Sequence, residues 1–179
     1  MASKRKPAAK RAAAKKPARR TAAAPRPRKP AGPSYKPGDM PFVTPGLIVR
    51  DPAASLDFYA RAFGFREKLR VPGPDGRVMH AEMKHQDGVI MLGPEPPNSY
   101  TSRAPSSVGA ATAGVYVYVE DVDRLFDQAT AAGASVMEPL TDQFWGDRTC
   151  KLRDPDGHIW QFATNKRPFD AAAVLPPAM

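Results

Sequence analysis

The sequence has little of several features that would fix its class at once. It contains a single cysteine, Cys150, in 179 residues, so no disulfide can form within the chain, and the reducing cytoplasm is the expected location. It contains no run of about 18 apolar residues, so neither a membrane-spanning helix nor a membrane partner is expected. The N-terminus is positively charged but lacks the apolar stretch of a secretory signal.

Acidic residues are nearly absent from the first forty positions. Residues 1–40 hold 13 Lys or Arg and one acid, Asp39, whereas the rest of the chain holds 14 bases and 17 acids. The formal net charge of +9 therefore comes from the N-terminal segment, and the remainder is mildly acidic. For this reason, the charge of the whole chain says nothing about what the folded part binds.

Residues 1–40 are predicted to be a disordered basic tail rich in Ala, Lys, Arg and Pro. Tyr35 is the only aromatic residue in it, so the segment has nothing from which to build a core. Its composition resembles that of linker-histone tails. Two interpretations stay open: sequence-independent binding to nucleic-acid phosphates, or a solvated extension without a specific partner. The basic residues expected to contact nucleic acid are Lys4, Arg5, Lys6, Lys10, Arg11, Lys15, Lys16, Arg19 and Arg20.

The rest of the chain contains an internal repeat. Each copy opens with a strand-like apolar run that reaches an aspartate suited to cap a helix, and these aspartates, Asp51 and Asp121, are 70 residues apart. The helical segments end near Gly64 and Gly133, and each copy closes with two strand-like runs around an Asp-Gly turn. The sequence therefore predicts an α+β fold built from a duplicated strand–helix–strand–strand–strand unit.

Three segments follow from this pattern: the basic tail 1–40, a folded domain 41–167 and a loose C-terminal tail 168–179. Within the domain, residues 93–112 join the two copies and are expected to form a flexible connection. A domain of about 130 residues is long enough to bury a core without disulfides or metals.

Six motifs in the domain carry a family resemblance. They are TPGLIVRD (44–51), DFYARAFGF (57–65), DGRVMHAEM (75–83), YVEDVD (118–123), FWGDR (144–148) and RDPDGHIWQ (153–161). Taken in this order they resemble the vicinal oxygen chelate superfamily of glyoxalases, bleomycin-resistance proteins and dioxygenases, and they are most similar to its PhnB-like group. The resemblance implies two βαβββ modules that form a curled mixed sheet with a central cleft, and a homodimer.

The resemblance also implies where a metal would bind. Metal-using members take ligands from the start of each module's first strand and from its last strand. In this sequence those positions hold Thr44, Leu92, Gly114 and Gln161. Leucine and glycine provide no side-chain donor, and a single glutamine does not make a site. No cofactor is therefore expected, and the alternative is a divalent metal at a rearranged site made by His80, Glu82 and Gln161.

Seven residues are candidates for lining the cleft: His80, Glu82, Tyr116, Tyr118, Trp145, Arg148 and Gln161. His80 and Glu82 share one strand face, where they either meet a ligand or form a structural ion pair with an arginine. The two tyrosines also share a face and either line the cleft or fill the core. The loop that contains Trp145 and Arg148 either meets an anionic ligand or anchors itself. His158 and Cys150 are expected to be packing residues.

Three functions stay open for the whole chain, and whether it is an enzyme is undecided. The first is binding of a small molecule without a metal. The second is a metal-dependent lyase, isomerase or dioxygenase reaction at the rearranged site. The third is association with nucleic acid in the nucleoid, where the tail binds and the domain acts as dimeriser or sensor.

Overall fold

The computed structural model describes residues 35–98 and 101–170. The predictions for residues 1–34 of the basic tail, with its nine nucleic-acid candidates, and for residues 171–179 of the C-terminal tail fall outside the described residues. All helices and strands reported below belong to the unit Lys36–Met179. No helix in this described part is both long and apolar enough to cross a membrane.

The elements follow the predicted order twice. The first module contains β1 (Gly46–Val49), α1 (Pro52–Phe63), β2 (Arg66–Pro72), β3 (Val78–His85) and β4 (Gly88–Pro94). The second contains β5 (Gly114–Tyr118), α3 (Val122–Ala131), β6 (Ser135–Asp142), β7 (Asp147–Arg153) and β8 (Ile159–Asn165). A short helix, α2 (Pro105–Val108), lies between them. The α+β fold of two βαβββ modules is confirmed.

The predicted caps hold both main helices in place. The Asp51 carboxylate accepts hydrogen bonds from the backbone N–H groups of Ala53 and Ala54 at the start of α1. Asp121 accepts from the Arg124 N–H at 3.0 Å at the start of α3. Gly64 ends α1 in the left-handed region, at φ 69°. Local chemistry therefore sets the helix boundaries.

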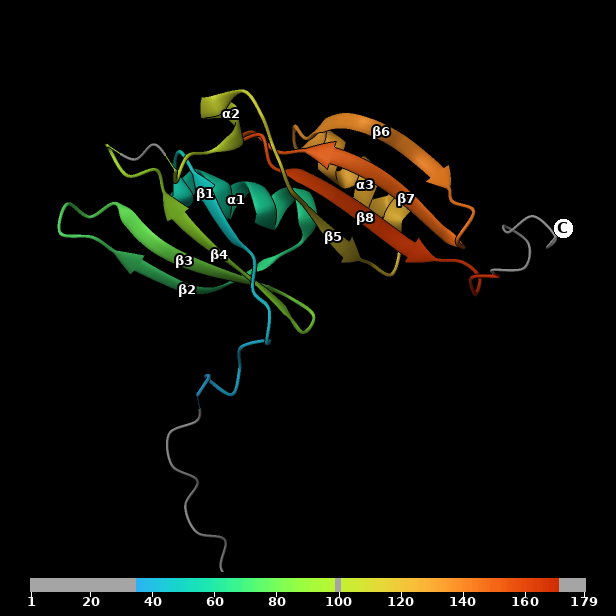
Figure 1. Ribbon diagram of the computed structural model, residues 1–179, viewed down its shortest axis with the longest axis horizontal. Coiled ribbons are helices and arrows are strands. Elements are labelled where there is room, and N and C mark those ends of the chain that lie inside the picture. The colour runs from blue at the N-terminus through green and yellow to red at the C-terminus, as the bar shows by residue number, and fades with distance from the viewer. Residues whose placement is uncertain (1–34, 99–100, 171–179) are drawn as a thin grey trace, which may run out of the picture. The chain divides into compact units, whose positions relative to one another are not determined.

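Each module forms its own four-stranded mixed sheet. The strand order is β1-β4-β3-β2 in the first sheet and β5-β8-β7-β6 in the second, with β1 parallel to β4 and β5 parallel to β8. Helix α1 packs on one face of the first sheet, and α3 packs on one face of the second (Figure 1). We call these the helix-covered faces, and the opposite ones the helix-free faces.

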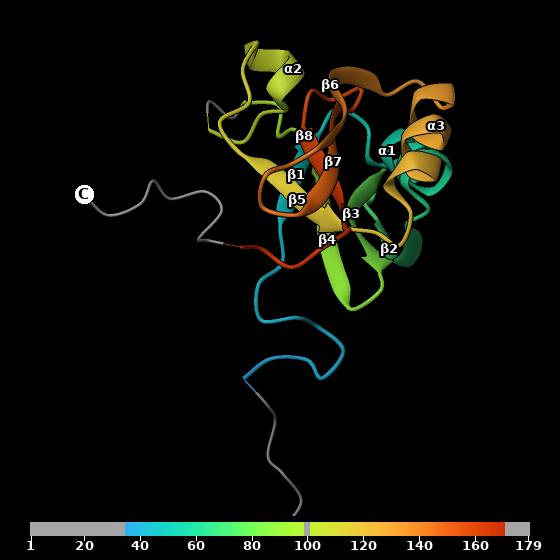
Figure 2. The same ribbon diagram turned by 90° about the vertical axis from the view of Figure 1, so that its right-hand side faces the viewer.

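The helix-covered faces of the two modules share one core. Helices α1 and α3 lie side by side (Figure 2). The ring of Tyr59 on α1 lies 5.2 Å from that of Trp160 on β8, and Phe63 lies 4.8 Å from Phe162, measured between centroids. All four side chains are at most 2% exposed, so this aromatic cluster joins the modules.

The turn 154–158 makes a second connection between the modules. The buried Asp154 carboxylate accepts hydrogen bonds from the Tyr59 hydroxyl at 2.7 Å and the Trp160 indole N–H at 2.9 Å. The Asp156 carboxylate accepts from the Ser55 hydroxyl at 2.8 Å. His158 Nε2 lies 2.9 Å from the carbonyl oxygen of Ile48, which makes this histidine a packing residue, as expected.

The connection between the modules is more ordered than expected. Residues 93–112 were expected to be flexible, but in the described part of this segment Ala104 is fully buried and the Ser106 N–H donates to the Asp156 carbonyl at 2.8 Å. Gly157 makes this approach possible, because a Cβ there would lie 2.7 Å from the Ser106 nitrogen. For residues 104–108 the expectation was wrong, because α2 rests on a turn that is distant in sequence.

Candidate functional site

On the helix-covered face of each sheet, buried side chains form a row that crosses neighbouring strands. Leu47, Leu92 and Ala81 are register partners on the first sheet, and Trp160 and Leu152 are partners on the second. All five are at most 8% exposed. Because side chains alternate along a strand, the residues next to these point to the helix-free faces.

One row of register partners crosses the helix-free face of each sheet. The first row consists of Leu69, Glu82, Met91 and Gly46. The second row consists of Glu138, Lys151, Gln161 and Tyr116. Three of the seven predicted candidates, Glu82, Gln161 and Tyr116, stand in these rows beside their cross-strand neighbours.

Glu82 in the first row is contacted by a lysine and a histidine. Its carboxylate lies 2.5 Å from the Lys68 ammonium and 3.5 Å from His80 Nε2. Lys68 also contacts the Asp39 carboxylate at 3.0 Å and the Met40 sulfur at 3.2 Å. The structural ion pair considered for Glu82 is therefore present, with a lysine from β2 in place of the expected arginine.

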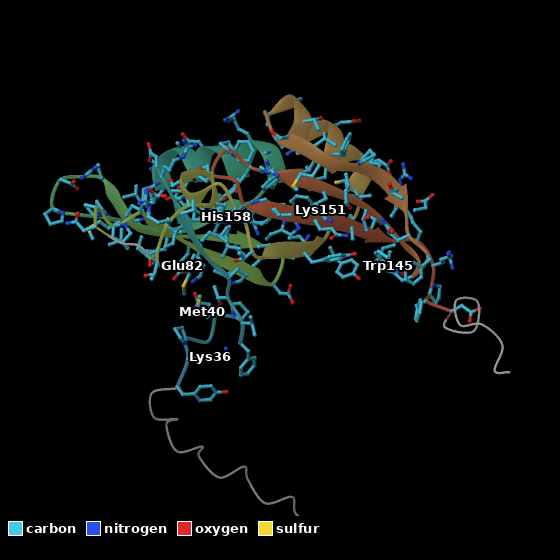
Figure 3. All side chains as sticks on the ribbon, turned by 45° about the horizontal axis from the view of Figure 1, so that its top comes forward. Lys36, Met40, Glu82, Trp145, Lys151 and His158 are labelled. Atoms are coloured by element: carbon cyan, nitrogen blue, oxygen red, sulfur yellow. The ribbon has the colours of Figure 1, made fainter. Side chains whose placement is uncertain are left out.

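In the second row, Lys151 is the cation and Glu138 is the anion. Their ammonium and carboxylate lie 2.5 Å apart. Gln161 lies between Lys151 and Tyr116 in the register, and no hydrogen bond of its side chain occurs within the described residues. Figure 3 shows Glu82 on the first sheet and Lys151 on the second.

Tyr116 and two further candidates converge on one buried carboxylate. Asp147 accepts hydrogen bonds from the Tyr116 and Tyr118 hydroxyls at 2.8 and 2.9 Å and from the Trp145 indole N–H at 3.0 Å. Asn165 donates to its other oxygen at 2.8 Å. Burial opposes ionisation, but these four donors outweigh it and hold the pKa of Asp147 below its usual value. We call this group the Asp147 cluster.

The Asp147 cluster decides the orientation of both tyrosines. Burial, and then the hydrogen bond to Asp147, raise the pKa of Tyr116, so its hydroxyl stays a donor at neutral pH. The side chains remain 42% exposed at Tyr116 and 59% exposed at Tyr118. Neither tyrosine fills the core, and their ring faces are available on the helix-free face. The sequence pattern does not single out Asp147 as the centre of the group, although it stands inside the FWGDR motif.

Arg148 is committed to two carboxylates. Its guanidinium contacts Asp123 at 2.8 to 3.0 Å and Asp142 at 3.1 Å. These contacts join β7 to the start of α3 and to the end of β6. Of the two roles considered for Arg148, the geometry therefore supports the anchor.

One of the four positions taken for metal ligands was misplaced. Leu92 is 1% exposed and belongs to the helix-covered row with Leu47. Register identifies its neighbour Met91 as the counterpart of Gln161, because Met91 pairs with Gly46 and Gln161 pairs with Tyr116, 70 residues further on. The two hairpin turns differ in length, so counting from the turn glycine shifts the position by one residue and moves it to the other face.

The corrected set fits a metal no better than the original. Thr44, Met91, Gly114 and Gln161 offer a hydroxyl, a thioether, no donor and an amide, a combination unsuited to a hard divalent cation. No group of three or more His, Cys, Asp or Glu side chains suited to a metal occurs within residues 35–98 and 101–170. In the rearranged set, His80 and Glu82 lie on the first sheet and Gln161 on the second.

Hollows of the described surface lie beside other segments. Three of them, of about 430, 1170 and 670 Å³, flank the 154–156 turn, the proline-rich segment 94–97 and the 142–148 loop. Neither Lys151 nor Gln161 lines any of the three. Tyr116 and Tyr118 also lie outside these three hollows, and their side chains are partly exposed.

Two βαβββ modules joined through their helices, each with one sheet face left free, define the class of this domain. The family model described as Glyoxalase/Bleomycin resistance protein/Dioxygenase superfamily matches residues 42–162. The chain belongs to this superfamily. The match extends from before β1 into β8 and excludes the basic segment.

Two relatives and two solved structures are similar to this chain. Uncharacterized protein Rv0887c of Mycobacterium tuberculosis is 41% identical over 122 residues, which cover 67% of this chain and 72% of that protein. Uncharacterized protein Mb0911c of Mycobacterium bovis has the same identity over 80% of its length. TioX from Micromonospora sp. ML1 is 36% identical, with a TM-score of 0.55 over 67% of this chain and 94% of TioX. Protein PA1353 from Pseudomonas aeruginosa, 20% identical with a TM-score of 0.56 over 70% and 98% of the two chains, shows the fold alone.

Proposed function

We propose that this protein binds a small molecule on the helix-free faces of its modules without the divalent metal that metal-using relatives hold. The observation that carries the proposal is the contrast between two sets of residues. The four metal positions lack a donor set suited to a divalent cation, whereas the residues around them on the helix-free faces provide two ion pairs and two partly exposed tyrosine rings. Such a mixture of aromatic and polar groups suits a small amphipathic ligand.

A thermal-shift screen of small molecules, run with and without a chelator, tests this function. Ligands that bind only the folded state raise its melting temperature by mass action. We expect stabilising compounds whose effect the chelator leaves unchanged. Stabilisation that disappears with chelator and returns with added divalent metal would instead support the metal-dependent lyase, isomerase or dioxygenase. No stabilisation by any compound class would reject both.

We also propose a homodimer of the PhnB-like type, held in the cytoplasm. Leu69 and Val71, on the edge strand β2 of the first sheet, are 42% and 40% exposed. A second copy that packs against this edge would remove their apolar area from water and leave the tyrosine surface of the second sheet open to a ligand. Light scattering after size exclusion should give twice the chain mass, and a monomeric mass at micromolar concentration argues against this assembly.

The N-terminal charge supports a second function, association with nucleic acid. Residues 1–40 carry 13 bases and one acid, and counterion release makes the affinity of such a segment fall steeply with salt. In a DNA mobility-shift assay, removal of residues 1–38 should abolish binding, and salt should weaken binding by the full chain. Equal binding by the shortened protein would assign the interaction to the domain.

A further inference from the structure

We infer that the helix-free face of the second sheet takes the anionic head of a small aromatic or apolar ligand, with Lys151 and Gln161 as the head-group donors. This inference rests on the proposed small-molecule function and names the chemical class of the ligand. Three observations carry it: spare hydrogen-bonding capacity in one row, a fixed aromatic surface beside that row, and a reversed charge order on the other sheet.

Lys151 has hydrogen-bonding capacity left. An ammonium group has three N–H donors, and within the described residues Glu138 is the only side chain to which Lys151 donates. Glu138 is 53% exposed on the edge strand β6, so its carboxylate can turn into solvent. A ligand carboxylate can therefore share Lys151 or take the place of Glu138.

Gln161 adds a neutral donor beside this cation. It is the register partner of Lys151 on one side and of Tyr116 on the other. Within the described residues, its side-chain amide makes no hydrogen bond. The amide is also not a buried group left without a partner. A carboxylate that bridges the ammonium and the amide would receive one charged and one neutral hydrogen bond.

The tyrosine rings provide the surface for the rest of the ligand. The hydroxyls of Tyr116 and Tyr118 are fixed by Asp147, and the ring centroids lie 5.3 Å apart. Because the hydroxyls are already hydrogen-bonded, the exposed ring faces offer apolar contact with little loss of side-chain entropy. A flat apolar body attached to the anionic head fits this surface.

The first sheet carries its ion pair in the opposite order. Its ion pair occupies the corresponding strands with reversed signs: Lys68 stands on β2 and Glu82 on β3, whereas Glu138 stands on β6 and Lys151 on β7. Lys68 is already in contact with Glu82, Asp39 and Met40. An anion is therefore expected on the second sheet and not on the first.

Three probes with one skeleton and different charge test the inference on the full chain: phenylacetate, phenylacetamide and phenethylammonium. Affinities are measured by ligand-observed NMR at constant, moderate salt, which screens the basic segment. Phenylacetate should bind about tenfold more tightly than the amide, the difference expected for one charged hydrogen bond. The ammonium probe should bind most weakly.

Variants of the two ion pairs locate the effect. Lys151→Met should reduce phenylacetate affinity about tenfold, to that of the amide, whereas Glu138→Gln should increase it by freeing the ammonium. Lys68→Met breaks the corresponding pair on the first sheet and should leave the affinity unchanged. Each variant keeps the basic segment, so non-specific binding cancels in the comparison.

The outcomes separate this inference from the proposed function. Equal binding of the three probes, with Lys151→Met unchanged, would overturn the anion site while small-molecule binding stands. Equal losses in Lys151→Met and Lys68→Met would also overturn it, because the effect would not belong to the second sheet. If none of the probes binds, the anion site for aromatic acids falls, and the thermal-shift screen decides separately whether the protein binds small molecules.

Discussion

The two modules of this protein are alike where they face their helices and unlike where they do not. Both have the same strand order and both begin their main helix after a capping aspartate. On the helix-free faces, the Lys68–Glu82 pair of the first module becomes the reversed Glu138–Lys151 pair of the second. The shared core requires packed apolar residues on the helix-covered faces, whereas the helix-free faces can carry different charged and polar residues.

The surroundings of the two ion pairs also differ. Lys68 is contacted by Asp39 and Met40, from the segment that precedes β1. Lys151 receives no such contact from the described residues. The two modules thus share one topology, but in the part of the chain that the structure describes, only the lysine of the first module is contacted by a neighbouring segment. Matched substitutions in the two modules can measure how far this difference extends.

Substitutions in the two hairpin turns that precede β4 and β8 should differ most in their effect on stability. Asp154→Ala removes the acceptor of the buried Tyr59 hydroxyl and Trp160 N–H, so we expect a loss of about 3 kcal/mol. Asp87→Ala, in the exposed turn of the first module, should cost less than about 0.5 kcal/mol. Urea unfolding measures both. Similar losses would show that the 154–158 turn does not hold the modules together.

The glycines before β3 and β7 provide a second matched pair. Both have positive φ, 79° at Gly76 and 104° at Gly146, but only at Gly146 would a Cβ overlap backbone, namely the Arg167 carbonyl oxygen. We expect Gly146→Ala to destabilise the protein by about 3 kcal/mol and Gly76→Ala by about 1 kcal/mol. Thermal unfolding of the two variants checks the order, and equal shifts would contradict the close approach of Arg167 to Gly146.

Asp147 should make the second module sensitive to acid. Its folded pKa is lowered, so its ionisation contributes stability above the unfolded pKa of about 3.9, and that stability is lost as the pH falls through the folded pKa. Asp147→Asn should cost about 1 to 2 kcal/mol at pH 7 and flatten the stability profile below about pH 4. Asp127→Asn, at an exposed position of α3, is the control. An unchanged acid profile in Asp147→Asn would argue against ionisation within the cluster.

His85 should give the smallest effect, in the first module. Burial lowers the pKa of this histidine, whose ring stacks on Phe65 at 5.0 Å. The folded state therefore disfavours the proton, and stability should fall as the pH drops below the unfolded value of about 6.5. His85→Gln should remove this dependence, and His80→Gln, on the opposite face of β3, should keep it. Chemical unfolding at pH 7.5 and 5.5 compares them, and a dependence that persists in His85→Gln would assign it to another group.

Much of the fold could be predicted because its signals are local. Asp51 and Asp121 act within one helical turn of their own position, and Gly64 adopts the left-handed conformation expected of it. The spacing of 70 residues between the aspartates reveals the duplication without any long-range information. Alternation within a single strand was likewise sufficient to place Tyr116 and Tyr118 together on one face.

The polar contacts of the site were harder to predict because they join residues distant in sequence. Asp147 meets Tyr116 across 31 positions, and Lys68 meets Glu82 across 14. Leu92 was mistaken for a metal-ligand position because a difference in turn length shifts the register by one residue, and one residue reverses the face of a strand. Only the strand pairing identifies Met91 as the counterpart of Gln161.

The most direct test of a metal-independent anion site is amide chemical-shift mapping of the full chain with phenylacetate in the presence of EDTA. We predict perturbations centred on β7 and β8, around Lys151 and Gln161, that the chelator leaves unchanged. Perturbations centred on β3 and β4 around Glu82, or perturbations that EDTA abolishes, would contradict such a site on the second sheet.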